Sequence, residues 1–296
     1  ADIVPITGEN RILAYAGLKK LNSEPRLAFQ HLIPTNIRNN VNISNVVFSI
    51  APKINAAGRI KHGSEAVRFM LSRDEEDCKR YLSDINSLNN ERKVIDVDIT
   101  ESALRQLNLI NTTEKYSTIV YDPTWNKGVI GIVASRLVDL YYKPTIVFTK
   151  NYEGELVGSA RSVQEFDIHE AIARNKALLT QFGGHMAAAG LALKEENFEQ
   201  FKIDFDRTVK EMSDGHYFKP SIEIDKELSF NDITKTFLET VMRMAPFGPE
   251  NMNPVFISRN LVATDFRLVG KEHARLFVHQ NDTRVTFPAI GFKLGK

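Results

Sequence analysis

Hydrophobic side chains recur at three- and four-residue steps through the stretch from Asp74 to Leu109, which contains neither glycine nor proline. The recurring positions, with one arginine among them, are Leu82, Ile85, Leu88, Arg92, Ile95, Ile99, Ala103 and Leu107. A repeat close to 3.6 residues places such positions on one face of a helix. We therefore expect one long helix over residues 73–110, or two helices in line, that packs along one lobe or bridges two lobes.

The residues before this helix predict several short helices. Asn10 can cap the first, Pro25 can start the next, and Ser44 can cap a further one. Pro52 would disturb the far end of that helix, because proline lacks an N–H group.

From Tyr116 onward, short apolar runs alternate with helical patterns. Strands are predicted at 117–122, 144–150 and 154–162, and helices at 128–141 and 167–182, the second capped by Asp167. A strand and a final helix follow over 190–212, and the alanine-rich run Met186–Ala189 favours a short helix. Alternating strands and helices predict an α/β layered sheet.

The pattern changes again after the segment HYFKP at 216–220. A strand is predicted at 221–228, a helix at 233–244 and a turn-rich loop at 245–254. Several short strands separated by Asn, Asp, Gly and Pro follow, which is typical of a small barrel or sandwich.

Composition narrows the classes of protein. A chain of 296 residues with 43% hydrophobic content is long enough for about two domains, and its net charge of +1 confines any polyanion-binding surface to a local patch. The single cysteine, Cys78, excludes an internal disulfide and fits a reducing cytoplasm. No signal peptide is recognisable, and Arg136 and Asp139 interrupt the most apolar stretch, so no membrane span is expected. Without an initiator methionine, we expect a piece of a longer protein.

Four glycine-containing segments carry candidate chemistry. In the first, Asn55 and Arg59 would share a helix face; in the second, Gly128 opens a helix. In the third, Ser159 and Arg161 alternate along a strand and so project to the same side. The fourth is FGGHMAAAG, which contains His185. Each alone has an ordinary reading as a helix end or a solvated turn. Together they supply a fork-shaped cation, hydroxyl donors, a helix N-terminus and a histidine, which a phosphate site needs.

Six segments in this order resemble the RecJ family, the single-stranded-DNA-specific exonucleases of the DHH phosphoesterase superfamily. The segments are ADIVPITGENR, APKINAAGR, WNKGVIGIVASRL, GSARS, FGGHMAAAG and APFGPENMNPVF. The resemblance implies an α/β fold with a DHHA1-type lobe, preceded by a long connecting helix and followed by an OB-fold β-barrel. It assigns residues 1–72 to the end of a DHH lobe, 73–110 to the connecting helix, 111–218 to the DHHA1 domain and 219–296 to an incomplete OB-fold.

The resemblance also implies roles for individual residues. Ser159 and Arg161, with Gly158 beside them, would seat the 5′-phosphate of DNA, and Arg59 with Asn55 would help set where the strand enters.

In the same family, His185, presented by Gly183 and Gly184, would contact the phosphate near the scissile bond. Asp2 matches the metal-binding aspartate of the last DHH motif. Asn126 departs from the family, which usually has histidine after the tryptophan.

The function implied is metal-dependent 5′→3′ hydrolysis of single-stranded DNA, with two Mn²⁺ or Mg²⁺ ions that activate water and stabilise the leaving oxygen. Most metal ligands of the family lie in a lobe that this sequence does not show, so we expect the chain alone to be inactive or nearly so. The expected partner is single-stranded DNA with a 5′-phosphorylated end, with a single-strand-binding protein or a helicase as further candidates and no membrane. Two alternatives stay open: a related phosphodiesterase for short oligonucleotides or cyclic dinucleotides, and a non-catalytic single-strand-binding fragment.

The last 38 residues suggest how a single strand could be held. Residues 259–296 carry seven basic and three acidic side chains, a net +4, with phenylalanines among them. These are Phe266, Phe277, Phe287 and Phe292. Aromatic side chains beside cations hold single strands in OB-folds, but phenylalanines on short strands usually belong to the core, so we expect most of the four to be buried.

Overall fold

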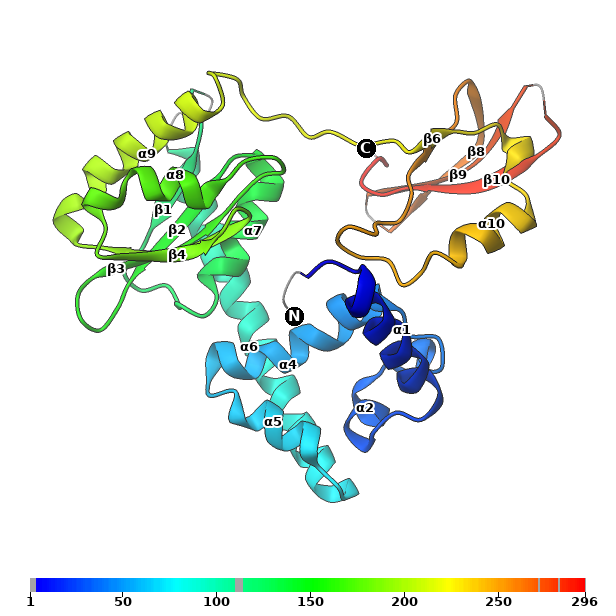
Figure 1. Ribbon diagram of the computed structural model, residues 1–296, viewed down its shortest axis with the longest axis horizontal. Helices are drawn as coiled ribbons and strands as arrows, with labels where there is room; N and C mark the ends of the chain where they lie inside the picture. Colours follow the sequence, from blue (N-terminus) through cyan, green and yellow to red (C-terminus); the bar gives the residue numbers. More distant parts are fainter. Residues whose placement is uncertain (1–3, 110–113, 271, 282, 296) are drawn as a thin grey trace. The chain divides into compact units, whose positions relative to one another are not determined.

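The computed structural model describes residues 4–109, 114–270, 272–281 and 283–295. The chain forms two compact units, which are described separately (Figure 1). One comprises Ala1–Glu24, Asn39–Ile43 and Ser221–Lys296, and the other comprises Pro25–Arg38 and Ser44–Pro220. Within the described ranges, no helix is both long enough and apolar enough to cross a lipid bilayer.

The larger unit is organised around one long helix. This helix, α6 (Glu75–Asn108), begins at Asp74, whose carboxylate accepts a hydrogen bond from the backbone N–H of Asp77 at 2.8 Å. It is a single uninterrupted helix of 34 residues. Shorter helices pack against its first half: α2 (Leu27–Leu32), α4 (Ala51–Ile60) and α5 (Ser64–Leu71). The 3₁₀ helix η1 (Thr35–Ile37) lies between α2 and α4 in the sequence.

The helix predicted at Ser44 changes type along its length. It starts as α3 (Ile43–Asn45), continues as a π-helix, η2 (Val46–Ile50), and becomes α4. Pro52 lies in the first turn of α4, directly after the π-helical segment. Because proline donates no N–H group, the change from π-helix to α-helix at this point fits the disturbance that the sequence predicts.

The second half of the larger unit is a five-stranded sheet with the order β1-β2-β3-β5-β4. Its strands are β1 (Thr118–Tyr121), β2 (Thr145–Lys150), β3 (Leu156–Arg161), β4 (Gln181–His185) and β5 (Ala188–Leu193). Only the β1–β2 pair is parallel, as expected for a crossover through a helix; the others are antiparallel.

Helices cover both faces of this sheet (Figure 1). On one face, α8 (Ile168–Arg174) and α9 (Phe198–Met212) bury a core with Phe148 and Leu191. On the other, α7 (Ile130–Tyr141) packs on β2 and β3 and, together with α6, buries Trp125. The 3₁₀ helices η3 (Lys176–Leu178) and η4 (Glu195–Asn197) connect these elements.

Two predictions in this region are wrong. The run Met186–Ala189 is not a helix, because Met186 and Ala187 form the turn between β4 and β5 and Ala188 starts β5. Strand pairing with β3 and β4 overrides the helix propensity of alanine. The helix predicted to extend to Phe182 ends at Arg174, although its cap is confirmed: Asp167 accepts a hydrogen bond from the Glu170 N–H at 2.9 Å.

The smaller unit combines helices with two sheets. Its helical elements are α1 (Gly8–Ser23), η5 (Phe230–Asp232) and α10 (Lys235–Met242). The strands β6 (Lys226–Glu227) and β7 (Phe256–Ile257) pair in parallel. The strands β8 (Leu261–Val269), β9 (His273–Gln280) and β10 (Thr286–Gly291) form an antiparallel sheet with β9 in the middle. Arg11 joins the ends of the unit, because its guanidinium donates a hydrogen bond to the Met244 carbonyl oxygen at 2.9 Å.

The expectation that most of the four late phenylalanines are buried is wrong. Phe266 and Phe292 are 63% and 68% exposed, and Phe277 and Phe287 are half-buried. The described strands of this part form an open three-stranded sheet, and every residue of β8 is exposed. An open edge strand has too few neighbours to bury both of its faces.

Candidate functional site

Ser159 and Arg161 form a pair on the strand β3. The Arg161 Nη1 atom donates a hydrogen bond to Ser159 Oγ at 3.0 Å and another to the carbonyl oxygen of Ala160 at 2.7 Å. Both side chains are half-buried. The two-residue period of a strand puts them on the same face of the sheet, as the sequence predicts. A hydroxyl and a guanidinium held side by side can together donate several hydrogen bonds to an anion.

The helix α7 approaches this pair closely, because it has a glycine at the contact point. A β-carbon on Gly131 would lie 2.8 Å from Arg161 Nη2 and 2.9 Å from Ser159 Oγ. No side chain fits in that position while the pair keeps its place. Gly131 therefore allows the first turn of α7 to lie against Ser159 and Arg161. The N–H groups of Ile130 and Ile132 in this turn already bond to the carbonyl oxygens of Asn126 and Val129, so the donors for an anion are the side chains of the pair.

Arg59 lies on the other side of the loop that leads into α7. Its Nη1 atom donates a hydrogen bond to the carbonyl oxygen of Gly128 at 3.0 Å, and a β-carbon on Gly128 would overlap the Arg59 carbonyl oxygen. Asn126 shapes the same loop, because its side-chain oxygen accepts a hydrogen bond from the Gly128 N–H at 2.8 Å. The asparagine that departs from the family pattern thus forms a side-chain turn that seats Gly128.

The arginines of the site influence one another. Burial lowers the pKa of Arg161, and the positive charge of Arg59 lowers it further. Burial also lowers the pKa of Arg59, the charge of Arg92 adds to this effect, and the carboxylate of Asp96 opposes it. Guanidinium groups stay protonated in proteins. Like charges that are partly removed from water favour the arrival of an anion.

Next to Ser159 the same face of the sheet is bare. Ser159 pairs with Gly190 on β5, and Gly190 pairs with Gly183 on β4, so these three residues form one row across the sheet. We call Gly190 and Gly183 the glycine strip. Both are exposed, and a β-carbon on Gly183 would meet nothing within 4 Å. The glycine strip is therefore an open floor beside the serine hydroxyl.

His185 stands at the far side of this floor. Arg161 pairs with Ala188, and Ala188 pairs with His185, so the row next to the glycine strip carries the arginine and the histidine on the same face. Two strand spacings separate them, about 10 Å. The imidazole is exposed, and its Nδ1 accepts a hydrogen bond from the Ala187 N–H at 3.3 Å. With Nδ1 as the acceptor, the neutral imidazole carries its proton on Nε2, from which it can donate to a ligand.

Two of the predicted site residues occupy other places. Gly158 faces the α8–α9 core, where a β-carbon would lie 2.7 Å from the Phe148 ring, so the structure separates it from Ser159 and Arg161. Gly184 has φ +149° and pairs with Ala189, and it serves the turn of the β4–β5 hairpin. Asn55 is half-buried on α4, one turn before Arg59. Asp2 lies outside the described residues.

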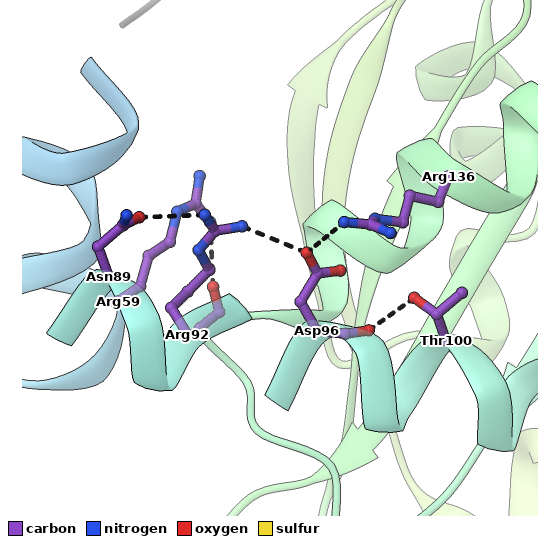
Figure 2. A network of polar contacts seen from close by, with 7 residues as sticks. Arg59, Asn89, Arg92, Asp96, Thr100 and Arg136 are labelled. Atoms are coloured by element: carbon purple, nitrogen blue, oxygen red, sulfur yellow. Dashed lines mark hydrogen bonds and ion pairs between the residues drawn. The ribbon is translucent and has the colours of Figure 1, made fainter. Parts of the chain in front are cut away.

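A polar network that the sequence did not reveal borders the site (Figure 2). Arg92 and Asp96 of α6 form an ion pair of 3.2 Å, and Arg136 of α7 reaches the same Asp96 oxygen at 2.8 Å. Arg92 also donates a hydrogen bond to Asn89 at 3.1 Å. The available signal was the charged Arg92 within the otherwise apolar stripe of the long helix. A charged side chain at a position facing the core requires a partner there.

Among the residues that the structure describes, no group of three or more His, Cys, Asp or Glu side chains is arranged to hold a metal ion. The donors gathered at this site are a hydroxyl and guanidinium groups. Their chemistry suits an anion.

Comparison with known proteins agrees with the geometry. The family model of the DHHA1 domain matches residues 113–211, and that of the RecJ OB domain matches residues 224–296. The five-stranded sheet with its helices therefore defines the chain as a DHHA1-domain protein, and the site described above lies in and beside that domain.

The relatives identify the family more closely. Over 301 residues the chain is 32% identical to the single-stranded-DNA-specific exonuclease RecJ of Bacillus subtilis (strain 168). The alignment covers 100% of this chain and 38% of the relative. The crystal structure of RecJ from Thermus thermophilus in complex with Mn²⁺ matches 100% of this chain and 43% of that chain, with a TM-score of 0.82 and 25% identity. The Mg²⁺ complex of the same protein gives a TM-score of 0.80 at 25% identity over 100% and 45% of the two chains. The chain belongs to the RecJ family, and it spans less than half the length of each of these relatives.

Proposed function

We propose that this chain supplies the 5′-phosphate-binding and strand-holding parts of a single-stranded-DNA-specific exonuclease that works in the 5′→3′ direction. The observation that carries the proposal is the Ser159–Arg161 pair, held against Gly131 of α7 and open toward the glycine strip. The serine hydroxyl and the guanidinium fork together form a set of donors for the oxygens of a terminal phosphate.

The floor of the site fits a nucleic-acid backbone. Gly183 and Gly190 leave the sheet surface beside Ser159 without side chains, so a sugar–phosphate chain can lie close to the strands. His185, about two strand spacings from Arg161, is placed to donate from Nε2 to a second phosphate. Since a terminal phosphate carries more charge than an internal one, a pocket with partly buried arginines selects a strand end and thereby sets the polarity.

The reaction in this proposal is hydrolysis of the phosphodiester bond. In the Thermus relatives Mn²⁺ or Mg²⁺ is bound, and such ions supply an activated water and stabilise the leaving oxygen. The described residues of this chain do not form a cluster that fits a metal ion. We therefore assign to them the binding and orientation of the strand and derive no step through the metal.

The RecJ OB domain supplies a second surface for the single strand in this proposal. Phe266 on β8 and Phe292, directly after β10, are exposed in a stretch, residues 259–296, that carries a net charge of +4, and there they can stack on bases. A single-strand-binding protein or a helicase belongs to the same proposal as a partner, because each delivers single strands. The free, buried Cys78 fits a reducing compartment, and the proposal therefore includes the cytoplasm as the place of work.

The proposal is tested by replacing Arg161. In equilibrium binding to the same single strand with a 5′-phosphate or a 5′-hydroxyl end, Arg161→Ala should weaken binding of the phosphorylated strand by about 10- to 100-fold, because it removes charged hydrogen bonds. The 5′-hydroxyl strand should be affected much less. Arg174→Ala is the matched control, since Arg174 is an exposed arginine of α8 that pairs with Glu170.

Equal loss for both strands would contradict the phosphate-pocket assignment. A second comparison addresses the alternative function of a phosphodiesterase for short oligonucleotides. The match to the RecJ OB domain and the exposed Phe266 and Phe292 favour a long strand, so the wild-type chain should bind a strand of about 20 nucleotides more tightly than a dinucleotide with the same 5′-phosphate. Equal affinity would favour the alternative.

A further inference from the structure

Asp96 is a buried carboxylate shared by two arginines. Its side chain is fully buried, and a single oxygen, Oδ2, accepts hydrogen bonds from Arg92 at 3.2 Å and from Arg136 at 2.8 Å (Figure 2). The other oxygen, Oδ1, is buried without a hydrogen-bond partner among the described residues. An ion pair in such a place needs a reason, because burial of a carboxylate is costly and half of this carboxylate is left unsatisfied.

The two arginines come from different elements. Arg92 precedes Asp96 by one turn of α6, and Arg136 lies on α7. The long helix carries α4, from which Arg59 projects, whereas α7 carries Gly131 against Ser159 and Arg161. Asp96 therefore ties the helices that hold one half of the phosphate site to the helix that holds the other half.

Charge connects the network to the site. Arg92 is held by Asp96 and by Asn89, and its side chain is only 12% exposed. It lies close enough to Arg59 for its charge to lower the pKa of Arg59, and Arg59 in turn lowers the pKa of Arg161. Arg59 and Arg161 also meet the same short stretch of chain, because Arg59 donates a hydrogen bond to the Gly128 carbonyl oxygen at 3.0 Å and Arg161 lies against Gly131. Mutual repulsion would spread these side chains unless something fixed them.

We propose that Asp96 is a positioning residue of the phosphate site: by holding Arg92 and Arg136 across the contact of α6 with α7, it fixes Arg59 and Arg161 in register for one phosphate group. This inference rests on the proposed function. It also predicts a result opposite to that of simple electrostatics. Removal of a negative charge near the site would by itself tighten binding of any DNA end, whereas loss of positioning weakens the preference for a phosphate.

The experiment measures the ratio of the dissociation constants for a 5′-hydroxyl and a 5′-phosphorylated single strand of one sequence at fixed salt. Asp96→Asn should lower this ratio by about tenfold, within the range found for coupled neighbouring residues. Asp98→Asn is the matched control, because Asp98 is two residues away on the same helix and exposed. Its ratio should equal that of the wild type. Asp96→Glu, which keeps the charge, should restore part of the preference.

Thermal unfolding shows whether each variant is folded. If Asp96→Asn does not fold, Arg136→Gln takes its place, since Arg136 is 47% exposed and its removal leaves the Arg92–Asp96 pair intact. It should lower the ratio by about threefold. If the folded Asp96→Asn variant, or Arg136→Gln in its place, has the wild-type ratio or a higher one, the positioning role is overturned. That outcome leaves the proposed phosphate site standing. A wild-type ratio of one would overturn both the positioning role and the proposed phosphate site.

Discussion

Gly131 shows how a single residue without a side chain sets the geometry of the site. Its Cα faces the ends of Arg161 and Ser159, and an added β-carbon would lie within 3 Å of both. The Arg161 guanidinium is at the far end of a flexible side chain and can move aside at low cost, and the Ser159 hydroxyl has to rotate away. Function at this position is therefore separable from stability.

We predict that Gly131→Ala keeps the fold and loses the phosphate preference. Alanine in a helix is favoured over glycine by up to about 1 kcal/mol, which offsets the crowding, whereas the displaced guanidinium should lower the preference for a 5′-phosphate by about tenfold. Binding of the two strand types and thermal unfolding together test this.

The control is Gly17→Ala in α1, where a β-carbon would meet nothing within 4 Å. It should raise the melting temperature and leave binding unchanged. A Gly131→Ala variant that keeps the full phosphate preference would show that the close approach of α7 does not position Arg161.

Arg92 marks the limit of residue-level prediction. It falls on the buried stripe of the long helix, and the i,i+4 spacing to Asp96 is visible in the sequence. The third member of the network, Arg136, is 40 residues further along the chain. No periodicity connects residues that far apart, so only the packing of α7 on α6 could reveal the shared carboxylate.

At the scale of elements, the β4–β5 hairpin decides where His185 lies. Two adjacent glycines in it have different tasks. Gly183 belongs to the open floor of the site, and Gly184, with φ +149°, lies where a β-carbon would overlap the carbonyl oxygen of Ala188. The two neighbours differ because successive residues of a strand point to opposite faces of the sheet.

We predict opposite consequences of the same substitution at these neighbours. Gly184→Ala should destabilise the chain by about 1–3 kcal/mol, because it combines backbone strain with a steric overlap. Gly183→Ala should change the free energy of unfolding by less than about 0.5 kcal/mol, as expected for a surface position with open space. Urea unfolding of the two variants provides the measurement, and equal destabilisation of both would contradict the distinct tasks.

The hairpin also shows why an element can be predicted wrongly. Met186–Ala189 has the composition of a helix, and intrinsic propensities for alanine differ from those of other residues by less than about 1 kcal/mol each. Pairing of β5 with β3 and β4 on both of its sides satisfies the backbone of six residues, Ala188–Leu193. Such hydrogen bonds with distant partners outweigh a local preference. In contrast, the cap of α8 at Asp167 depends on residues three apart and was predicted correctly.

At the scale of the whole molecule, the proposed function divides between two kinds of surface. The DHHA1 domain presents the cations and hydroxyls that suit a phosphate, and the RecJ OB domain presents aromatic side chains and basic residues that suit a single strand. With a net charge of +1, the chain has to concentrate its affinity for DNA in these places.

We predict that the exposed Phe266 and Phe292 affect binding and that the half-buried Phe287 affects stability. Phe266→Ala and Phe292→Ala should each weaken single-strand binding by about 1–3 kcal/mol and leave the melting temperature nearly unchanged. The ring of Phe287 packs edge-on against Phe230, with centroids 4.9 Å apart. Phe287→Ala should therefore lower the free energy of unfolding by about 2 kcal/mol. Unchanged binding by both exposed variants would remove base stacking at these positions from the proposal.

The sequence by itself determined what depends on neighbours along the chain. The long helix, the strands β1, β2 and β3 and the common side of Ser159 and Arg161 all follow from local patterns along the chain, and the order of the motifs indicated the family. Tertiary structure alone decided which glycines leave space at the phosphate site. Gly131, Gly183 and Gly190 acquire this role only when α7, β3, β5 and β4 are placed side by side. It also decided that Asp96 serves two arginines, because the free energy of a buried carboxylate depends on partners that folding brings together.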